Sequence, residues 1–480
     1  MRYETTIHHR FEAEGQPFVY AAGTAAVCGL DDTAHELLER FSVEGGADIG
    51  TWRDAEERET FEELVSFGLM KPVGEKLPIT ADPLPMPFPL STLVLNVASK
   101  CNLSCTYCYE YGEDQLSALK QKPKMSAETA RSAIELFLKE SGGRPDLSIT
   151  FFGGETLLGF EVIKVATEYA LERAAEEGRT MGFSLTTNAT LLDEPVIDFL
   201  TRHRFGINIS IDGDKDDHDR HRTFASGRGS HGEIVPKIKE LLQRNRPHGR
   251  PIGARVTVTA GSASVPAIYR HLYDEVGFDA VGFAPVTSAP GRDYELAGDG
   301  MNRLLVEFEE LAEEYVAAAL QGKRHGFSNL HDLLQELHQG TNKAHPCGAG
   351  LGLAAVSTEG DISPCHRFVG SKEHELGNLE DGFDAEKRSS FLESVHISNK
   401  PDCDSCFARP HCSGGCYHEA HVRYGDVSTP NLHYCTWIRS WTDLGLRCYG
   451  RIAIGNPDYL MNFEGRPNPV AESAPILSSN

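Results

Sequence analysis

The sequence predicts an α/β fold with a parallel sheet, preceded by a small separate unit and followed by a cysteine-rich region. From about residue 90 to 325, strand-like apolar runs alternate with amphipathic helical runs. That alternation is typical of a parallel sheet covered by helices. The first 80 residues and the segment from Cys347 to Cys435 follow different patterns. A chain of 480 residues is long enough for two to four domains.

The N-terminal unit is expected to span residues 1–80. Alternating stretches at Tyr3–Phe11 and Pro17–Val27 predict a β-hairpin. Amphipathic helices are expected near Ala34–Phe41 and Asp54–Phe67. Prolines are dense in the following segment, so residues 81–90 are predicted to form a stiff, extended linker.

The strand–helix units are expected to form one domain over residues 91–325. Six strands are predicted, at Leu93–Val97, Leu147–Phe152, Phe183–Thr187, Ile207–Ile211, Ala254–Thr259 and Ala280–Ala284. Helices are predicted between them, at Ala127–Lys139, Glu161–Ala175, Glu194–His203, Gly232–Gln243 and Val265–Tyr273. A long helix near Asn302–Leu320 leads out of this domain. Ligands on parallel sheets gather at the carboxyl ends of the strands, so functional residues are expected there.

Composition excludes several classes of function. The formal net charge is −24, which argues against nucleic acid as the main partner. The N-terminus has no apolar signal region, and no run of about 20 apolar residues could span a membrane, so a cytoplasmic protein is expected. The 12 cysteines are concentrated in two places, which indicates metal ligation rather than a framework of disulfides.

The first cysteine group follows the first predicted strand, as Cys101-Asn-Leu-Ser-Cys105-Thr-Tyr-Cys108. Three thiolates on one loop can hold three irons of a four-iron cluster and leave the fourth iron open. An open iron can bind and activate a small molecule. The alternative is a zinc site, but zinc sites usually have four protein ligands from paired cysteine knuckles.

This spacing resembles that of the radical S-adenosylmethionine (SAM) enzymes. The resemblance implies a partial (β/α)6 barrel whose [4Fe-4S] cluster binds SAM. It also implies that one electron cleaves SAM to methionine and a 5′-deoxyadenosyl radical, which removes hydrogen from the substrate. By the same resemblance, the residues expected to contact SAM are Tyr107, Gly153, Gly154, Glu155, Asn188, Ser210 and Arg222. Arg222 is expected to pair with the SAM carboxylate, and Arg220 is its rival.

The second cysteine group resembles a SPASM domain, a C-terminal extension with two auxiliary [4Fe-4S] clusters, here expected over residues 345–448. The implied ligands of the outer cluster are Cys403, Cys406, Cys412 and Cys435. The implied ligands of the inner cluster are Cys347, Cys365 and Cys416. Some relatives have a fourth inner ligand where this chain has Leu353, so the inner cluster either has an open iron or is closed by another ligand such as Cys448. One or two zinc sites are the alternative.

Together these parts resemble radical SAM enzymes that modify ribosomally made peptides or protein subunits, with a winged-helix-like N-terminal domain for peptide recognition. The segment around the first cysteines is most similar to the maturation proteins of quinohemoprotein amine dehydrogenase. Those proteins cross-link cysteine sulfur to methylene carbons of Asp or Glu in the small subunit of the dehydrogenase. The resemblance implies a small Cys-rich peptide or protein subunit as substrate. It also implies an external one-electron reductant of the flavodoxin or ferredoxin type.

Two other functions remain open at this point. One is a maturase of another kind, either similar to the anaerobic sulfatase maturases or joining sulfur to α-carbons as in sactipeptides. The other is an iron–sulfur electron carrier or scaffold that does not turn over SAM.

Asp404, between two implied outer-cluster ligands, is the candidate base for a substrate thiol proton if it faces the cavity, and His366 is its rival. Cys28 is interpreted as a small buried hydrophobic residue. Residues 464–480 are expected to form a tail.

Overall fold

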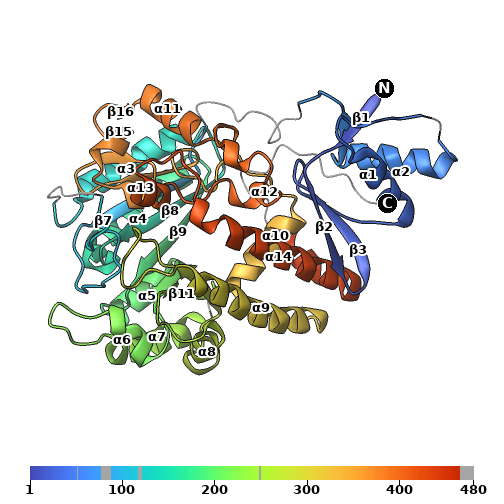
Figure 1. Cartoon of the computed structure of the whole chain (residues 1–480). Coiled ribbons are helices and arrows are strands. Elements are labelled where there is room, and N and C mark those ends of the chain that lie inside the picture. Colours follow the sequence, from blue (N-terminus) through green and yellow to red (C-terminus); the bar gives the residue numbers. More distant parts are fainter. Residues whose placement is uncertain (51, 77–87, 117–121, 248–249, 465–480) are drawn as a thin grey trace.

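The structure is a computed structural model that describes residues 1–50, 52–76, 88–116, 122–247 and 250–464. Most of the predicted linker (81–90) and all but the first residue of the predicted tail (464–480) lie outside these residues. Figure 1 shows the N-terminal strands and helices at one side of a larger body that contains the central sheet and the cysteine-rich region.

The N-terminal unit has two small antiparallel sheets and two helices. One sheet has the strand order β5–β1–β6 and the other β2–β3–β4. Its elements are β1 (Arg2–Thr5), β2 (His8–Ala13), β3 (Gln16–Ala21), β4 (Ala26–Gly29), α1 (Asp32–Phe41), β5 (Ala47–Asp48), α2 (Ala55–Ser66) and β6 (Met70–Pro72). The predicted hairpin is formed by β2 and β3 alone, joined at Glu14 and Gly15, whose φ angles are 49° and 75°. Each predicted hairpin stretch was too long, because the apolar alternation continues across a turn into a neighbouring strand.

Both N-terminal helices begin at an aspartate cap. The Asp31 carboxylate accepts from the Ala34 N–H at 2.7 Å, and the Asp54 carboxylate accepts from the Glu57 N–H at 2.9 Å. Such caps satisfy backbone donors that a helix start leaves unpaired. The helices pack through a separate apolar cluster that includes Leu37, Leu38, Phe41, Phe61 and Leu64. That this unit grips a precursor peptide stays a prediction.

The central sheet has ten strands in the order β12–β11–β10–β9–β8–β7–β13–β14–β15–β16. Strands β7 to β12 are parallel to their neighbours, which confirms the predicted α/β class. The six strands are β7 (Thr92–Ala98), β8 (Asp146–Gly153), β9 (Thr180–Thr187), β10 (Gly206–Ser210), β11 (Ile252–Val258) and β12 (Ala280–Pro285). Each overlaps one of the six predicted strands.

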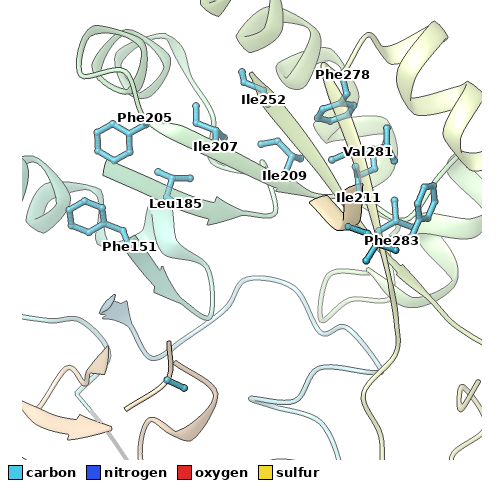
Figure 2. Packing of buried hydrophobic residues seen from close by; sticks show 14 of the residues in the cluster. Phe151, Leu185, Phe205, Ile207, Ile209, Ile211, Ile252, Phe278, Val281 and Phe283 are labelled. Carbon is cyan, nitrogen blue, oxygen red and sulfur yellow. The ribbon is translucent and has the colours of Figure 1, made fainter. Parts of the chain in front are cut away.

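Helices follow each of these strands and cover one face of the sheet. They are α3 (Ala127–Glu140), η1 (Thr156–Gly159), α4 (Phe160–Glu176), α5 (Glu194–Arg202), α6 (Lys215–His221), α7 (His231–Asn245), α8 (Val265–Arg270), the π-helix η2 (His271–Val276) and α9 (Asp299–Leu320). Side chains of alternate strand residues form the core beneath them, as Figure 2 shows for Phe151, Leu185, Ile207 and Ile209. Burying each such side chain stabilises the fold by roughly 1.5–3 kcal/mol.

The cysteine-rich region continues the same sheet. Strand β13 (Leu353–Val356) pairs in parallel with β7, with Leu353 opposite Thr92. The other elements are α10 (Ser328–His338), β14 (Asp361–Ser363), η3 (His366–Phe368), η4 (Lys372–His374), β15 (Gly377–Asn378), β16 (Gly382–Phe383), α11 (Ala385–Val395), η5 (Ile397–Asn399), η6 (Pro401–Cys403), α12 (Arg409–Cys412), α13 (Tyr417–Tyr424), η7 (Leu432–Tyr434), α14 (Cys435–Gly455) and η8 (Pro457–Phe463). Helix α14 begins at the last cysteine of this pattern and has 21 residues.

Helix α14 joins the N-terminal unit to the rest of the molecule. It packs beside α9 and α10 and against β2 (Figure 1). His9 Nε2 on β2 lies 2.7 Å from Asp443 Oδ1 on α14, and the Tyr20 hydroxyl lies 3.0 Å from His411 Nε2. Among the described residues, no helix combines the length and apolar character needed to cross a membrane.

Candidate functional site

A cavity at the carboxyl ends of the parallel strands brings the predicted SAM-site residues together. It is lined by Cys101, Cys105 and Cys108, and by Tyr107 between them. The other predicted residues on its wall are Gly153, Gly154, Glu155, Asn188, Ser210 and Arg222. The topology explains this convergence, because parallel strands end at one edge of the sheet and each contributes its next residues there.

The cysteine loop is fixed by backbone hydrogen bonds to the segment around the end of α6. The Ser104 N–H donates to the Thr223 carbonyl at 2.8 Å, and the Thr106 N–H donates to the His221 carbonyl at 3.2 Å. Burial raises the pKa of Cys101 to about 12 and that of Cys108 to about 11. Buried, closely spaced thiols become thiolates when a metal coordinates them. The donor set therefore fits an iron–sulfur cluster.

Gly153 and Gly154 allow the end of β8 to touch the cysteine loop. Gly153 has φ +140°, a conformation that favours glycine. A Cβ on Gly153 would overlap the Ala98 carbonyl, and one on Gly154 would overlap the Lys100 carbonyl. Lys100 directly precedes the first cysteine, so the two glycines set the position of the cysteines relative to the second strand.

Glu155 joins the ends of β8 and β9. Its buried carboxylate accepts from the Leu157 N–H at 3.0 Å, the Asn188 N–H at 2.8 Å and the Thr187 hydroxyl at 2.5 Å. The Asn188 side-chain amide in turn donates to the Asn102 side-chain carbonyl at 3.0 Å. Glu155 and Asn188 thus hold the cavity wall in shape, and their contact with SAM stays a prediction.

Arg222 points into the cavity beside the cysteine loop. Its guanidinium donates to the Tyr107 hydroxyl at 2.8 Å, and that hydroxyl donates to the buried Asp212 carboxylate. The Arg222 Nε–H is buried and has no hydrogen-bond partner among the described residues. An unpaired buried donor of this kind suits an anionic ligand.

Arg220, the rival of Arg222, lies outside the cavity. Its side chain is exposed, donates to the Gly261 carbonyl and lies 3.4 Å from an Asp217 oxygen. The geometry therefore favours Arg222 as the arginine that meets a bound carboxylate.

The second cysteine group separates into the two sets that the sequence predicts. The Cys403 thiol interacts electrostatically with those of Cys412, Cys406 and Cys435, and burial raises its pKa to about 12. The Cys365 thiol interacts in the same way with Cys416 and Cys347, and burial raises its pKa to about 12. The structure thus gathers four thiols in one set and three in the other, as an outer and an inner cluster would need.

The structure shows where the two positions lie that the sequence left open for a fourth ligand of the inner set. Leu353 begins β13 and is held in the sheet by pairing with Thr92. Cys448 is buried on α14, where the charged groups that influence its thiol are Arg451, Glu313, Arg447 and Glu309. Cys448 as a fourth ligand of the inner cluster stays a prediction, which these surroundings do not favour, because the groups named are charged residues of α9 and α14 rather than cysteines of either set.

Asp404 and His366, the two candidate bases, lie in different surroundings. Asp404 is exposed and is absent from the described residues that line the cavity. His366 is half-buried and contacts Phe152, a cavity residue, with ring centroids 4.1 Å apart and the ring planes tilted by 35°. Burial lowers the pKa of His366 to about 3, so it is a neutral imidazole at physiological pH.

Two arginines in or near the cavity were not predicted from the sequence. Arg367 lines the cavity, lies over the Tyr109 ring at 4.5 Å and donates to the Thr287 hydroxyl at 3.2 Å. Burial lowers the pKa of Arg255 on β11, and the attraction of the Asp332 carboxylate acts on its guanidinium more strongly than the repulsion from Arg367. Arg367 lies two residues after Cys365, an implied cluster ligand, and this position could have identified it from the sequence. Nothing in the sequence marks Arg255 except its place in a predicted strand.

Comparisons with known proteins agree with this geometry. Residues 95–258 match the profile of the Radical SAM superfamily. The serine-type anaerobic sulfatase-maturating enzyme of Bacteroides thetaiotaomicron is 27% identical over 376 residues, covering 73% of this chain and 87% of the relative. The cysteine-type enzyme of Clostridium perfringens is 27% identical over 343 residues, covering 68% of this chain and 89% of the relative.

Solved structures show the same fold. A histidine-tagged form of anSMEcpe with bound AdoMet is 25% identical, with a TM-score of 0.64, and the match covers 78% of this chain and 98% of that chain. The chain therefore has a radical SAM domain within a fold shared with sulfatase-maturating enzymes. The predicted resemblance to radical SAM enzymes and the predicted fold class are confirmed, and AdoMet in the related structure agrees with the predicted cofactor. The relatives named here are sulfatase-maturating enzymes and not amine dehydrogenase maturation proteins, so they support the alternative function of the sequence analysis better than its main one.

Proposed function

We propose that this protein, whose residues 95–258 form a radical SAM domain, is an enzyme that modifies side chains of a peptide or protein substrate. The observation that carries the proposal is the single cavity in which Cys101, Cys105 and Cys108 meet the glycines of β8 and Arg222. An electron carrier would not need a buried arginine with an unpaired donor beside its cluster ligands.

Each part of the cavity has a role in this proposal. The three thiolates hold a [4Fe-4S] cluster, and Arg222, positioned by Tyr107, binds the SAM carboxylate. When bound and reduced by an external flavodoxin- or ferredoxin-type donor, the cluster and SAM supply a radical that removes hydrogen from an unactivated carbon. Glu155, through its three accepted hydrogen bonds, keeps the wall fixed so that the reacting groups stay aligned.

The two further thiol sets fit two auxiliary [4Fe-4S] clusters. Cys403, Cys406, Cys412 and Cys435 would bind the outer one, which then has all its ligands. Cys347, Cys365 and Cys416 would bind the inner one, which keeps a position free for a ligand from outside the described residues. The zinc alternative is disfavoured, because a three-thiol set beside a four-thiol set is not the arrangement of paired zinc knuckles.

The relatives favour a maturase similar to the anaerobic sulfatase-maturating enzymes. Two of them, of the serine and cysteine types, align with more than two thirds of this chain. The related anSMEcpe has been solved with AdoMet and a Cp18Cys peptide. By analogy, the substrate of this chain is a peptide segment that carries a serine or cysteine, and the reaction is the oxidation of that side chain.

Thioether formation between cysteine sulfur and Asp or Glu methylene groups is the second candidate. Two observations favour it. The inner set has three thiols, so a substrate thiolate can take the remaining iron position. Arg367 lines the cavity, so its guanidinium can pair with the carboxylate of a substrate Asp or Glu.

Mass spectrometry of two substrates separates these reactions. The holoenzyme, SAM and a reductant are incubated with a sulfatase-derived Cys peptide and, separately, with a Cys-rich dehydrogenase subunit. Sulfatase-type oxidation changes one residue of the peptide. Thioether formation removes two hydrogens and links two residues of the subunit, which tandem spectra show as a missing cleavage between them. Unchanged masses of both substrates, in samples that cleave SAM, would contradict a maturase.

Asp404 is proposed as the acceptor of the substrate thiol proton in the thioether reaction. Its exposed carboxylate lies next to an outer-set cysteine and outside the cavity lining, so the substrate thiol would have to meet it at the surface. A cysteine thiol has a pKa near ~8.5, so a base is needed to form the thiolate at neutral pH. Asp404→Asn keeps the shape and removes the base. We expect unchanged iron content and 5′-deoxyadenosine formation but loss of cross-linked product, measured by mass spectrometry.

Asp402→Asn is the matched control, because Asp402 is an exposed aspartate of the same turn. It should form product at the wild-type rate. Normal cross-linking by Asp404→Asn would exclude Asp404 as the base and direct the search to His366.

A further inference from the structure

Lys400 is a buried lysine without a hydrogen-bond partner. It lies between η5 and η6, and its side chain is 1% exposed. Its Nζ has no hydrogen-bond partner among the described residues, and no carboxylate lies within ion-pair distance there. Burying an ammonium group without a partner costs several kcal/mol. The position of Lys400 therefore indicates a negative charge that the protein atoms alone do not supply.

The surroundings of Lys400 show where that charge would be. The groups that act electrostatically on its ammonium are the thiols of Cys403 and Cys412, then the Asp426 carboxylate, then the Cys416 thiol. Cys403 and Cys412 belong to the outer set, and Cys416 belongs to the inner set. The ammonium also lies 5.3 Å from the centre of the Tyr417 ring, on the residue after Cys416. Lys400 thus lies between the two auxiliary sets.

The backbone leaves space for this ammonium. Gly414, between Cys412 and Cys416, has φ +83°, and a Cβ there would lie only 2.6 Å from Lys400 Nζ. Any other residue at 414 would be strained, and its Cβ would overlap the Lys400 side chain. The segment from Cys412 of the outer set to Cys416 of the inner set thus leaves room for the Lys400 side chain.

Lys343, another lysine near these thiols, has a different role. Its Nζ lies 2.8 Å and 2.9 Å from the two Glu336 oxygens, so its charge is already paired. Lys400 has no such partner among the described residues, so its charge, like those of Arg367 and Arg409, can act on the thiols of the auxiliary sites.

We propose that Lys400 is a positioning residue whose ammonium, placed between the two auxiliary clusters, raises the reduction potential of both. The proposal rests on the proposed function, because it requires that the two thiol sets hold clusters. When the two thiol sets hold their clusters, an electron from the external reductant would make each of these sites more negative. A nearby positive charge stabilises the more negative state, and net charge and hydrogen bonds to sulfur are known to set cluster potentials.

The test is a redox titration of the fully reconstituted holoenzyme, followed by electron paramagnetic resonance. Lys400→Met keeps the length of the side chain and removes the charge. We expect the midpoint potentials of both auxiliary clusters to shift to more negative values, and that of the SAM-binding cluster to stay unchanged. Lys387→Met, at a lysine that is 58% exposed on α11, should shift none of the three.

Lys400→Arg separates the effect of the positive charge from the effect of side-chain packing. Because it keeps the charge, its auxiliary potentials should stay close to wild type. Unchanged potentials in a fully loaded Lys400→Met protein would overturn the proposal. So would loss of auxiliary iron from both variants, which would show that shape rather than charge matters. A wild-type protein that holds zinc in these sets would instead refute the proposed function, before Lys400 is tested.

Discussion

Replacing Cys101, Cys105 and Cys108 with alanine is expected to abolish SAM cleavage. All three thiols line the same cavity, and none of the other described cysteines does. Without these ligands the cluster that binds and reduces SAM cannot form, whereas the two auxiliary thiol sets are untouched. Iron content should fall from about twelve to about eight per chain by ligand counting. 5′-Deoxyadenosine, measured by chromatography after anaerobic reduction, should fall to the level without enzyme.

Cys28→Ala is the matched control for this triple variant. Cys28 lies on β4 of the N-terminal unit, and the charged group that influences its thiol is Glu63 rather than another cysteine, so it is a poor candidate for a ligand. Its replacement should change neither iron content nor SAM cleavage. If the triple variant still produced 5′-deoxyadenosine, the assignment of these cysteines to the SAM-binding cluster would be wrong.

Gly154→Ala is expected to lower SAM cleavage by at least ~100-fold, because a misplacement of about 1 Å in an active site can cost that much. The new methyl group would overlap the Lys100 carbonyl and the Tyr111 hydroxyl. The carbonyl is backbone and cannot turn away, so the cysteine loop has to move relative to β8. The rate of 5′-deoxyadenosine formation measures the effect.

Gly182→Ala provides the comparison on a neighbouring strand. A Cβ at Gly182 on β9 would lie 3.7 Å from the Leu147 carbonyl, an ordinary contact. That variant should cleave SAM at the wild-type rate. A Gly154→Ala protein as active as Gly182→Ala would show that the close approach of β8 to the cysteine loop is not needed for catalysis.

The barrel strands could be predicted from sequence because each is buried and rich in β-branched or aromatic residues. In β10, for example, Ile207 and Ile209 are almost completely buried. The α6 helix was missed because Lys215–His221 has no apolar periodicity; its start is set by the Asp214 carboxylate, which accepts from two backbone N–H groups. The pairing of β13 with β7 was also missed, since it joins residues about 260 positions apart in the chain.

The cysteines of the site could be predicted because their spacing alone identifies them. The contacts that position these cysteines could not be predicted from the sequence. The bonds from Arg222 to Tyr107 and from Tyr107 to Asp212 link residues more than 100 positions apart. Nothing in the sequence around Lys400 distinguishes it from a surface lysine; only its burial between the two thiol sets does. The sequence alone also could not distinguish Cys448 from the ligand cysteines. Its place on α14, among charged residues of α9 and α14, does so.

The most direct test of the central claim is the reaction of the anaerobically reconstituted wild-type protein with SAM and a strong reductant. Iron and zinc are measured on the same sample, and products are separated by chromatography. The account predicts about twelve iron atoms per chain. It also predicts methionine and 5′-deoxyadenosine in equal amounts, formed only when the reductant is present. Zinc in place of iron, or reduced iron-loaded protein that forms no 5′-deoxyadenosine, would contradict it.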